Sequence, residues 1–213
     1  SEGRFPKCLI SKEGILLGGL TGIDLEEVLW DKGLQRRRSL WIWRRPSKGN
    51  LLIEPIRSSF RLIIFGAGHI GRYLAQIGHM LEFEVLIYDD REEFLDPKAF
   101  PPDTLLVKGP FSGTLRDLKI EEGDFITIAT RGHLNDMWAL EQVLRTSPAY
   151  VGMIGSKRKR EQIFGYLKEK GFKEETLSQV HSPIGLEIGA ETPQEIAVSI
   201  MAEIIQVKSR LFS

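Results

Sequence analysis

Short apolar runs alternate with helical patterns along most of this chain, from Arg61 to its end. Each run is rich in β-branched and aliphatic residues and ends at a glycine, a charged residue or a turn. Continuous runs of this kind are typical of strands buried on both faces, as in a parallel sheet. The runs that predict strands are residues 62–65, 85–88, 105–107, 125–129 and 151–154.

Between these runs the hydrophobic period changes to about 3.6 residues, which predicts amphipathic helices. The last helix has a clear start signal, because Thr192 is followed by Pro193 and, at the third helical position, by Glu195. That arrangement is a capping box with proline at the first helical position. Its apolar face is expected to carry Ile196, Ile200, Ile204 and Leu211.

Alternating strands and helices indicate βαβ units joined by right-handed crossovers. We therefore predict a Rossmann-type, doubly wound α/β fold with a parallel sheet for residues 58–213. Residues 1–57 are expected to form a small separate N-terminal domain. Short strands are predicted there at residues 15–17 and 51–53, with one or two helical turns at residues 25–30.

Charge and cysteine content narrow the range of partners. Lysine plus arginine equals aspartate plus glutamate, at 29 each, so no net field attracts nucleic acid or an anionic membrane. Cys8 is the only cysteine, which rules out an internal disulfide and a thiolate zinc cluster and fits a reducing compartment. No apolar stretch approaches the roughly 20 residues of a membrane span. We expect a cytoplasmic protein without nucleic-acid or membrane partners.

A glycine-rich loop follows the first predicted strand of the large domain. Residues 66–71 read Gly-Ala-Gly-His-Ile-Gly and match the G-x-G-x-x-G pattern of dinucleotide sites. In such sites the first glycine permits a tight turn, the second admits a pyrophosphate to the backbone, and the third allows close helix packing. The helix N-terminus also favours the phosphate charge. A glycine turn without any ligand is the alternative interpretation.

An acidic residue follows this loop by about 20 residues, at the end of the second predicted strand. Asp89 is placed there to accept hydrogen bonds from a ribose hydroxyl. Asp90 and Arg91 come next, and Arg91 leaves a 2′-phosphate possible. His69, within the loop, contacts either a phosphate or only solvent, and the sequence leaves both interpretations open.

The later strands also end in polar loops, and ligands of open α/β sheets bind outside the carboxyl ends of the strands. Residues 130–133 read Thr-Arg-Gly-His, which indicates anion binding with a group able to transfer a proton. Simple turn chemistry, with Asn135 or Asp136 as the helix N-cap, is the alternative. Gly155 and Ser156 precede another helix and form a second loop suited to phosphate.

Two further segments are ambiguous. The basic run at residues 157–160 is more typical of a solvated helix face than of a ligand site, so at most one or two of its residues are assigned to ligand. The glycine-rich segment 181–190 either closes over a ligand or simply connects two elements. The four histidines have no metal-ligand spacing, so no bound metal ion is expected.

The expected site residues gather at the ends of the first, second, fourth and fifth strands. Arg131 and His133 are the candidates for a catalytic role. The expected cofactor-binding residues are Gly66, Gly68, His69, Ile70, Gly71, Asp89, Asp90, Arg91, Thr130, Arg131, Gly132, His133, Gly155, Ser156 and Lys157.

Several motifs occurring together carry a resemblance to a known family. They are residues 65–69, 89–91, 129–133, 150–156, 182–186 and 192–197. On these motifs the chain resembles the XdhC/CoxI family, the accessory factors of xanthine dehydrogenase and related molybdenum hydroxylases. The resemblance implies binding of the molybdenum cofactor, a phosphorylated pterin often extended to a dinucleotide, and its delivery to a partner such as xanthine dehydrogenase.

The N-terminal part departs from the family pattern. Where the family has a cysteine after a serine-glycine-glycine turn, this chain has Asp24. The departure puts sulfur handling by this chain in doubt. An NAD(P)-dependent oxidoreductase and a nucleotide-sensing regulatory module are the alternative functions, with NAD(P) or FAD as the ligand. The tryptophans Trp41 and Trp43 favour a partner surface, and we expect a homodimer.

Overall fold

A computed structural model describes residues 60–211, except 114, 116 and 117, together with the backbone of four short strands before residue 54. The chain divides into two compact units, Ser1–Arg57 with Phe212–Ser213, and Ser58–Leu211.

The first unit contains two antiparallel strand pairs. Strand β1 (Cys8–Ser11) pairs with β2 (Gly14–Gly18), and β3 (Trp41–Arg45) pairs with β4 (Gly49–Ile53). The strands predicted at residues 15–17 and 51–53 are therefore confirmed. The predicted turns at residues 25–30, and Asp24, lie outside the described residues.

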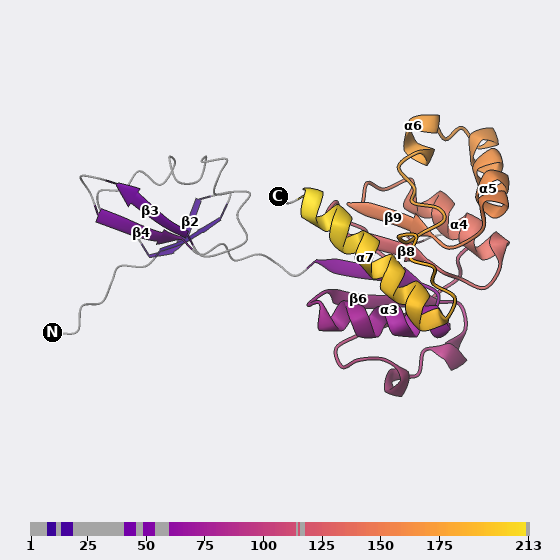
Figure 1. The fold of residues 1–213 in the computed structure, drawn as a ribbon, viewed down its shortest axis with the longest axis horizontal. Helices are drawn as coiled ribbons and strands as arrows, with labels where there is room; N and C mark the ends of the chain where they lie inside the picture. Colours follow the sequence, from indigo (N-terminus) through magenta and orange to yellow (C-terminus); the bar gives the residue numbers. More distant parts are fainter. Residues whose placement is uncertain are drawn as a thin grey trace. The chain divides into compact units, whose positions relative to one another are not determined.

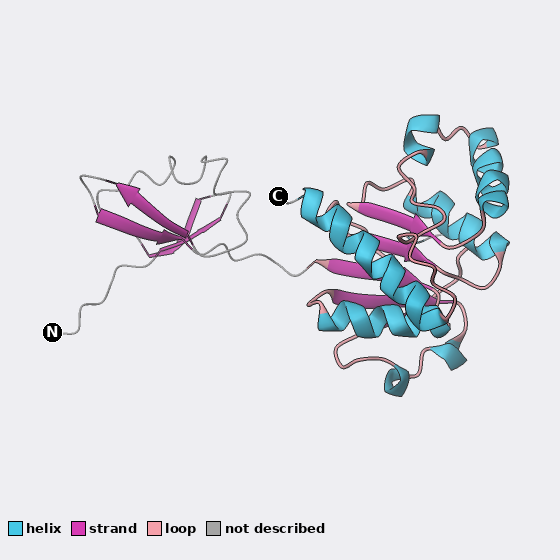
Figure 2. Ribbon diagram, in the orientation of Figure 1, coloured by secondary structure: helices cyan, strands magenta, loops and turns pink. Residues whose placement is uncertain are grey.

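The second unit is built on a five-stranded parallel sheet, visible in Figure 1 and, coloured by element type, in Figure 2. Its spatial order is β7-β6-β5-β8-β9, with every neighbouring pair parallel. The order reverses direction between β5 and β8, which is the switch point where ligands of doubly wound folds bind. The predicted Rossmann-type fold is confirmed. Its strands are β5 (Arg61–Phe65), β6 (Glu84–Asp89), β7 (Leu105–Lys108), β8 (Phe125–Ile128) and β9 (Tyr150–Met153).

Helices cover both faces of this sheet. Helix α3 (His69–Met80) and the long C-terminal helix α7 (Pro193–Leu211) pack against each other on one face, toward the viewer in Figure 1. Helices α4 (His133–Val143) and α5 (Lys157–Glu169) pack together on the other. The short elements are α6 (Glu174–Leu177), η1 (Glu92–Phe94) and η2 (Pro97–Ala99).

Strands β5, β8 and β9 are buried on both faces, as their continuous apolar runs predict. Every residue of β8 and β9 is buried, and four of the five residues of β5 are fully buried. Alternation within β5 places Ile63 and Phe65 in the core cluster beneath α4 and α5, while Leu62 and Ile64 belong to the opposite face. Removal of these side chains from water is the main force that holds the helices to the sheet.

The capping box at the start of α7 is confirmed. The hydroxyl of Thr192 accepts a hydrogen bond from the Glu195 N–H at 3.3 Å, and the Glu195 carboxylate accepts one from the Thr192 N–H at 2.9 Å. The expectation for Leu211 is wrong, because its side chain is 52% exposed at the end of the helix, beyond the sheet that buries Ile200 and Ile204. None of the helices described here has the length and apolar character needed to cross a membrane.

Candidate functional site

The glycine loop lies between the ends of β5 and β8, against backbone on both sides. Gly66 adopts φ +117°, and a Cβ at this position would lie 2.3 Å from the carbonyl oxygen of Ala129. A Cβ on Gly71 would lie 2.0 Å from the carbonyl oxygen of Gly66. Both positions therefore exclude any side chain, which confirms the tight turn and the close helix packing expected of the first and third glycines.

Gly68, the second glycine of the loop, is different, because a Cβ there would meet no protein atom within 4 Å. It is the N-cap of α3, and no side chain caps this end of the helix. The first turn contains no acidic residue, and His69 is exposed. The first N–H groups of α3 thus lack a side-chain acceptor beside open space, an arrangement suited to an anion.

The carboxylate of Asp89 is buried and holds the glycine loop to the segment after β6. Its Oδ2 accepts hydrogen bonds from the Ala67 N–H at 2.7 Å and from Arg91 Nη2 at 3.0 Å. Its Oδ1 accepts from the Arg91 N–H at 3.0 Å and from Arg91 Nε at 2.9 Å. Burial raises the pKa of the Asp89 carboxyl, but the hydrogen bonds from Arg91 and Ala67 outweigh it and hold the pKa below its ordinary value.

The two residues that follow have unlike environments. Asp90 is exposed, and its pKa is raised by partial burial and by the neighbouring Asp89 carboxylate. The guanidinium of Arg91 lies 3.7 Å from the centre of the Phe94 ring while it pairs with Asp89. The guanidinium of Arg72, in the first turn of α3, lies 6.0 Å from the same ring. The Nε of Arg72 is buried and has no hydrogen-bond partner.

Three consecutive residues are exposed where the loop after β8 leads into α4, namely Arg131, Gly132 and His133. Gly132 has φ +90° and is the N-cap of α4, again without a side-chain cap. The alternative that made Asn135 or Asp136 the N-cap is therefore wrong, since both residues lie inside the helix. A glycine at the cap leaves the first N–H groups of α4, like those of α3, without a side-chain acceptor.

Asp136 is instead a fully buried carboxylate beneath this loop. Its Oδ1 accepts hydrogen bonds from the Thr130 N–H at 2.9 Å and from the Thr130 hydroxyl at 2.5 Å. Its Oδ2 pairs with the ammonium group of Lys159. Thr130, expected to contact a cofactor, therefore uses its hydroxyl within the protein, and Asp136 fixes the position of the loop that carries Arg131 and His133.

The loop after β9 has its own internal cap. Gly155 has φ +152°, and Ser156 is the N-cap of α5, where its hydroxyl accepts a hydrogen bond from the Lys159 N–H at 3.3 Å. Lys157 and Arg158 are exposed. One of the first backbone N–H groups of α5 thus already has a side-chain acceptor within the protein. This distinguishes α5 from α3 and α4, whose starts have no side-chain cap.

The segment 181–190 begins beside the free edge of β9 and contacts both this strand and α7. His181 forms an isolated parallel bridge with Gly152, and its Nδ1 lies 2.9 Å from Glu203 Oε1 in α7. The other carboxylate oxygen of Glu203 accepts hydrogen bonds from the Tyr150 hydroxyl at 2.7 Å and from the Gly185 N–H at 2.8 Å. These contacts support the interpretation of this segment as a connection that packs against the sheet.

Sequence reasoning missed the roles of Asp136 and Glu203, although helical periodicity contains a signal for both. Asp136 precedes Ala139, Leu140 and Val143 by three, four and seven positions, so it belongs to the buried face of α4. Glu203 follows Ile196, Ser199 and Ile200 by seven, four and three positions in α7 in the same way. An acid on an apolar helix face predicts a buried carboxylate with a partner.

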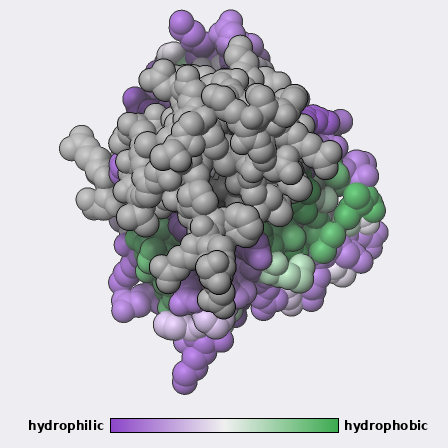
Figure 3. Space-filling view, turned by 90° about the vertical axis from the view of Figure 1, so that its left-hand side faces the viewer, coloured by the Kyte–Doolittle hydropathy of each residue, from purple (hydrophilic) through white to green (hydrophobic). Residues whose placement is uncertain are grey.

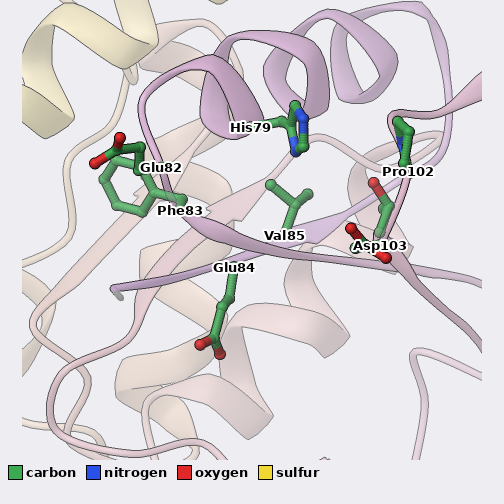
Figure 4. Close-up of a pocket in the computed structure, with 8 residues that line it drawn as sticks. His79, Glu82, Phe83, Glu84, Val85, Pro102 and Asp103 are labelled. Atoms are coloured by element: carbon green, nitrogen blue, oxygen red, sulfur yellow. The ribbon is translucent and has the colours of Figure 1, made fainter. Parts of the chain in front are cut away.

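A hollow of about 310 Å³ lies at the opposite edge of the sheet, at the amino end of β6. Figure 4 shows His79 and Val85 on one side of the strand, with Glu84 pointing away from them. The described residues contain no group of three or more acidic, histidine or cysteine side chains able to hold a metal ion. None of the residues that line this hollow belongs to the glycine loop, so the two features are separate. The hollow is lined by His79, Glu82, Phe83, Glu84, Val85, Pro102, Asp103 and Thr104.

Several large hydrophobic side chains reach the surface of the described residues. Figure 3 shows hydrophobic residues among hydrophilic ones on the face that it presents. Leu134 is 49% exposed in the first turn of α4, and Ile188 is 54% exposed shortly before α7. Gln194, in the first turn of α7, donates a hydrogen bond to the Tyr73 hydroxyl of α3 at 2.9 Å, so α7 begins beside α3. Leu134, in the helix that follows β8, therefore belongs to the edge where the glycine loop lies, and Ile188 precedes a helix that begins beside α3.

Comparison with known proteins identifies the family to which this chain is similar. The family model described as the XdhC Rossmann domain matches residues 62–204. The chain is 41% identical over 230 residues to the Escherichia coli protein YqeB, which covers 98% of this chain and 42% of YqeB. It is 30% identical over 162 residues to a Bacillus subtilis protein named as a probable xanthine dehydrogenase subunit, covering 76% of this chain and 47% of that protein.

A solved structure is also similar. The crystal structure of a xanthine dehydrogenase from Bacillus halodurans superposes with a TM-score of 0.64 at 29% identity, covering 76% of this chain and 45% of that chain. The chain thus spans somewhat less than half the length of the relatives that it matches.

Proposed function

This chain belongs to the XdhC family, and we propose that it is an accessory factor that binds the molybdenum cofactor at the glycine loop and delivers it to a molybdenum hydroxylase of the xanthine dehydrogenase type. We also propose that it works as a homodimer in the cytoplasm. The name of the Bacillus subtilis relative, a probable xanthine dehydrogenase subunit, supports the choice of partner.

One observation carries this proposal: the open backbone at Gly68. A ligand phosphate could approach this N–H without meeting a side chain, and α3 begins there without a cap. The second uncapped helix start, at α4, lies after the neighbouring strand and adds the exposed cation of Arg131 and the exposed imidazole of His133. Two anion-suited helix starts on adjacent strands fit a phosphorylated or dinucleotide ligand.

The residues present fit the phosphate of a phosphorylated pterin. Gly68 and His69 would hold its phosphate end, and Arg131 and His133 would lie on the α4 side of the switch point. The cofactor, when bound, supplies the molybdenum centre whose redox chemistry belongs to the partner enzyme. The protein residues bind and orient this group, and the exposed Leu134 in the first turn of α4 lies at the same edge, where a partner enzyme would have to approach.

An NAD(P)-dependent oxidoreductase is the second candidate. The exposed His133, placed beside a Rossmann switch point, favours it because a histidine there can act as a general acid or base. Against NAD as its coenzyme, the carboxylate of Asp89 is fully engaged by protein donors, so the usual ribose acceptor is occupied.

Native mass spectrometry of the full chain tests the ligand. The protein is incubated separately with molybdenum cofactor, NAD, NADP and FAD, and we expect retention of the molybdenum cofactor. Retention of nicotinamide nucleotides alone would contradict the proposal and favour an oxidoreductase.

Co-expression with a molybdenum hydroxylase tests delivery. We expect Arg131→Ala and His133→Ala to lower the specific activity of the partner enzyme at least tenfold, with its cofactor content reduced in parallel. Arg145→Ala is the matched control, because Arg145 is exposed at the other end of α4 and pairs with Glu141. Full partner activity in both site variants would contradict the proposed role.

A further inference from the structure

In dinucleotide-binding folds, the acid at the end of the second strand accepts hydrogen bonds from the ribose hydroxyls. Asp89 occupies that position at the end of β6, and its hydrogen bond to the Ala67 N–H places its carboxylate against the glycine loop. A ligand could use this carboxylate only through acceptor capacity that the protein leaves free.

The hydrogen bonds around Asp89 use that capacity completely. A carboxylate has about four lone-pair sites. Two donors reach Oδ1 and two reach Oδ2, at distances of 2.7 to 3.0 Å. Three of these four donors belong to Arg91. The carboxylate is only 1% exposed, so a ribose diol cannot reach it unless the guanidinium of Arg91 moves away.

Arg91 is held in this position from two sides. Its guanidinium pairs with Asp89 through Nε and Nη2 and lies 3.7 Å from the centre of the Phe94 ring. Its side chain is 17% exposed. Displacement would break a two-point charge-assisted contact and leave a buried carboxylate short of donors, which is unfavourable.

Arg91 and the nearby Arg72 of α3 retain donors suited to a phosphate. The pairing with Asp89 uses Nε and Nη2 of Arg91, which leaves Nη1 outside that contact. Arg72 lies near the same ring and has a buried Nε with no hydrogen-bond partner. Guanidinium groups bind phosphate oxygens with matched geometry. Asp90 is the opposing charge here, with its carboxylate 3.7 Å from Arg91 Nε.

We propose that Arg91 is a specificity-determining residue, which makes the β6 side of the site accept a phosphomonoester and reject an unmodified ribose diol. This inference rests on the proposed use of the glycine loop as the ligand site. A phosphomonoester is present both on a phosphorylated pterin and at the 2′ position of NADP. The ligand class that follows is a phosphate-bearing nucleotide or pterin, and NAD is excluded as the preferred ligand.

Isothermal titration calorimetry of the full chain with NAD and NADP tests this selectivity. We expect NADP to bind at least tenfold more tightly than NAD. In Arg91→Ala the freed Asp89 should accept the diol, so NAD binding should tighten about tenfold and the preference for NADP should disappear. Adding Asp89→Asn to that variant should remove the gain. Arg91→Lys, which keeps the cation but not the two-point contact, should also reduce the preference if the alanine variant does not fold.

Lys108→Ala is the matched control, because Lys108 is an exposed cation on the neighbouring strand β7 that pairs with Glu92. Its ratio of NADP to NAD affinity should stay within twofold of the original. Equal affinity of the unchanged protein for both nucleotides, an unaltered ratio in the Arg91 variants, or binding of neither nucleotide to any of the proteins would overturn the inference.

Competition identifies the source of the phosphate. Displacement of NADP by molybdenum cofactor would assign the position to a pterin phosphate, and simultaneous binding would assign it to a nucleotide 2′-phosphate. Both results support selectivity for a phosphomonoester. If the cofactor is retained in mass spectrometry while the Arg91 variants leave the affinity ratio unchanged, the proposed function stands and only this inference fails.

Discussion

Lys159 of α5 forms an ion pair with the carboxylate of Asp136, which is fully buried in α4. The same carboxylate accepts two hydrogen bonds from Thr130, at the end of β8. This single acid therefore connects the loop after β8 to the helix after β9, and the exposed Arg131 and His133 depend on it for their position.

Removal of the cation should destabilise the protein strongly. In Lys159→Met the Asp136 carboxylate stays buried without its charge partner, and breaking such a pair costs about 3 kcal/mol of the free energy of unfolding. Urea unfolding followed by circular dichroism measures the change. Arg158→Met, at an exposed neighbouring position, is the control and should change the free energy of unfolding by less than about 0.5 kcal/mol. Equal effects of the two substitutions would show that the buried pair contributes no more than a surface charge.

Gly68→Ala should separate ligand binding from folding. The new methyl group meets no protein atom within 4 Å, and the residue has an ordinary φ of −71°, so we expect the free energy of unfolding to change by less than about 1 kcal/mol. The methyl group would occupy the space through which a phosphate approaches the backbone, so ligand affinity should fall at least tenfold.

Gly71→Ala is the contrasting variant for this prediction. Its Cβ would lie 2.0 Å from the carbonyl oxygen of Gly66, so the loop must shift and the protein should lose stability. Thermal unfolding and calorimetric titration on both variants distinguish the two effects. Unchanged affinity in a stable Gly68→Ala protein would show that no ligand approaches this backbone.

Glu203 should make the stability of the protein sensitive to acid. Burial raises the pKa of its carboxyl, but hydrogen bonds from His181, Tyr150 and the Gly185 N–H outweigh this and lower the pKa below its ordinary value of 4.5. A lowered pKa in the folded state means that the stabilisation is complete above the unfolded-state value and is lost as the pH falls through the folded-state value.

The variant Glu203→Gln should therefore lose less stability than the original protein between about pH 5 and pH 3. Urea unfolding at a series of pH values measures the two slopes. Glu187→Gln, at an exposed position before α7, is the matched control and should retain the slope of the original protein. Parallel slopes for the original protein and Glu203→Gln would show that Glu203 is not the source of the acid sensitivity.

Thr192→Ala should weaken the start of α7. The substitution removes the hydroxyl that accepts the Glu195 N–H, and loss of an N-cap of this kind costs about 1 kcal/mol. Thr192→Ser keeps the hydroxyl and should retain most of the stability. Urea unfolding of the two variants side by side checks the prediction, and equal loss in both would point to the threonine methyl group instead of the cap.

Local patterns in the sequence predicted the framework of the site well. The apolar runs predicted all five strands of the sheet, because a strand that is buried on both faces has hydrophobic residues at consecutive positions. The spacing of Gly66 and Gly71 predicted a tight turn and close packing, which only the absence of a side chain permits. The capping box formed by Thr192 and Glu195 lies within four consecutive positions, so the sequence alone predicted the start of α7.

The partners of the charged side chains came only from the tertiary structure. Asp89 and Ala67 are 22 positions apart, Asp136 and Lys159 are 23 apart, and Glu203 and Tyr150 are 53 apart. Each pair meets because the parallel sheet brings consecutive strand ends to one edge, or because α7 returns along the sheet. The sequence alone determined that acids follow the strands and interrupt apolar helix faces. Whether each acid faces a ligand or a buried cation was decided by packing, because a carboxylate removed from water must take the nearest donors that the fold supplies.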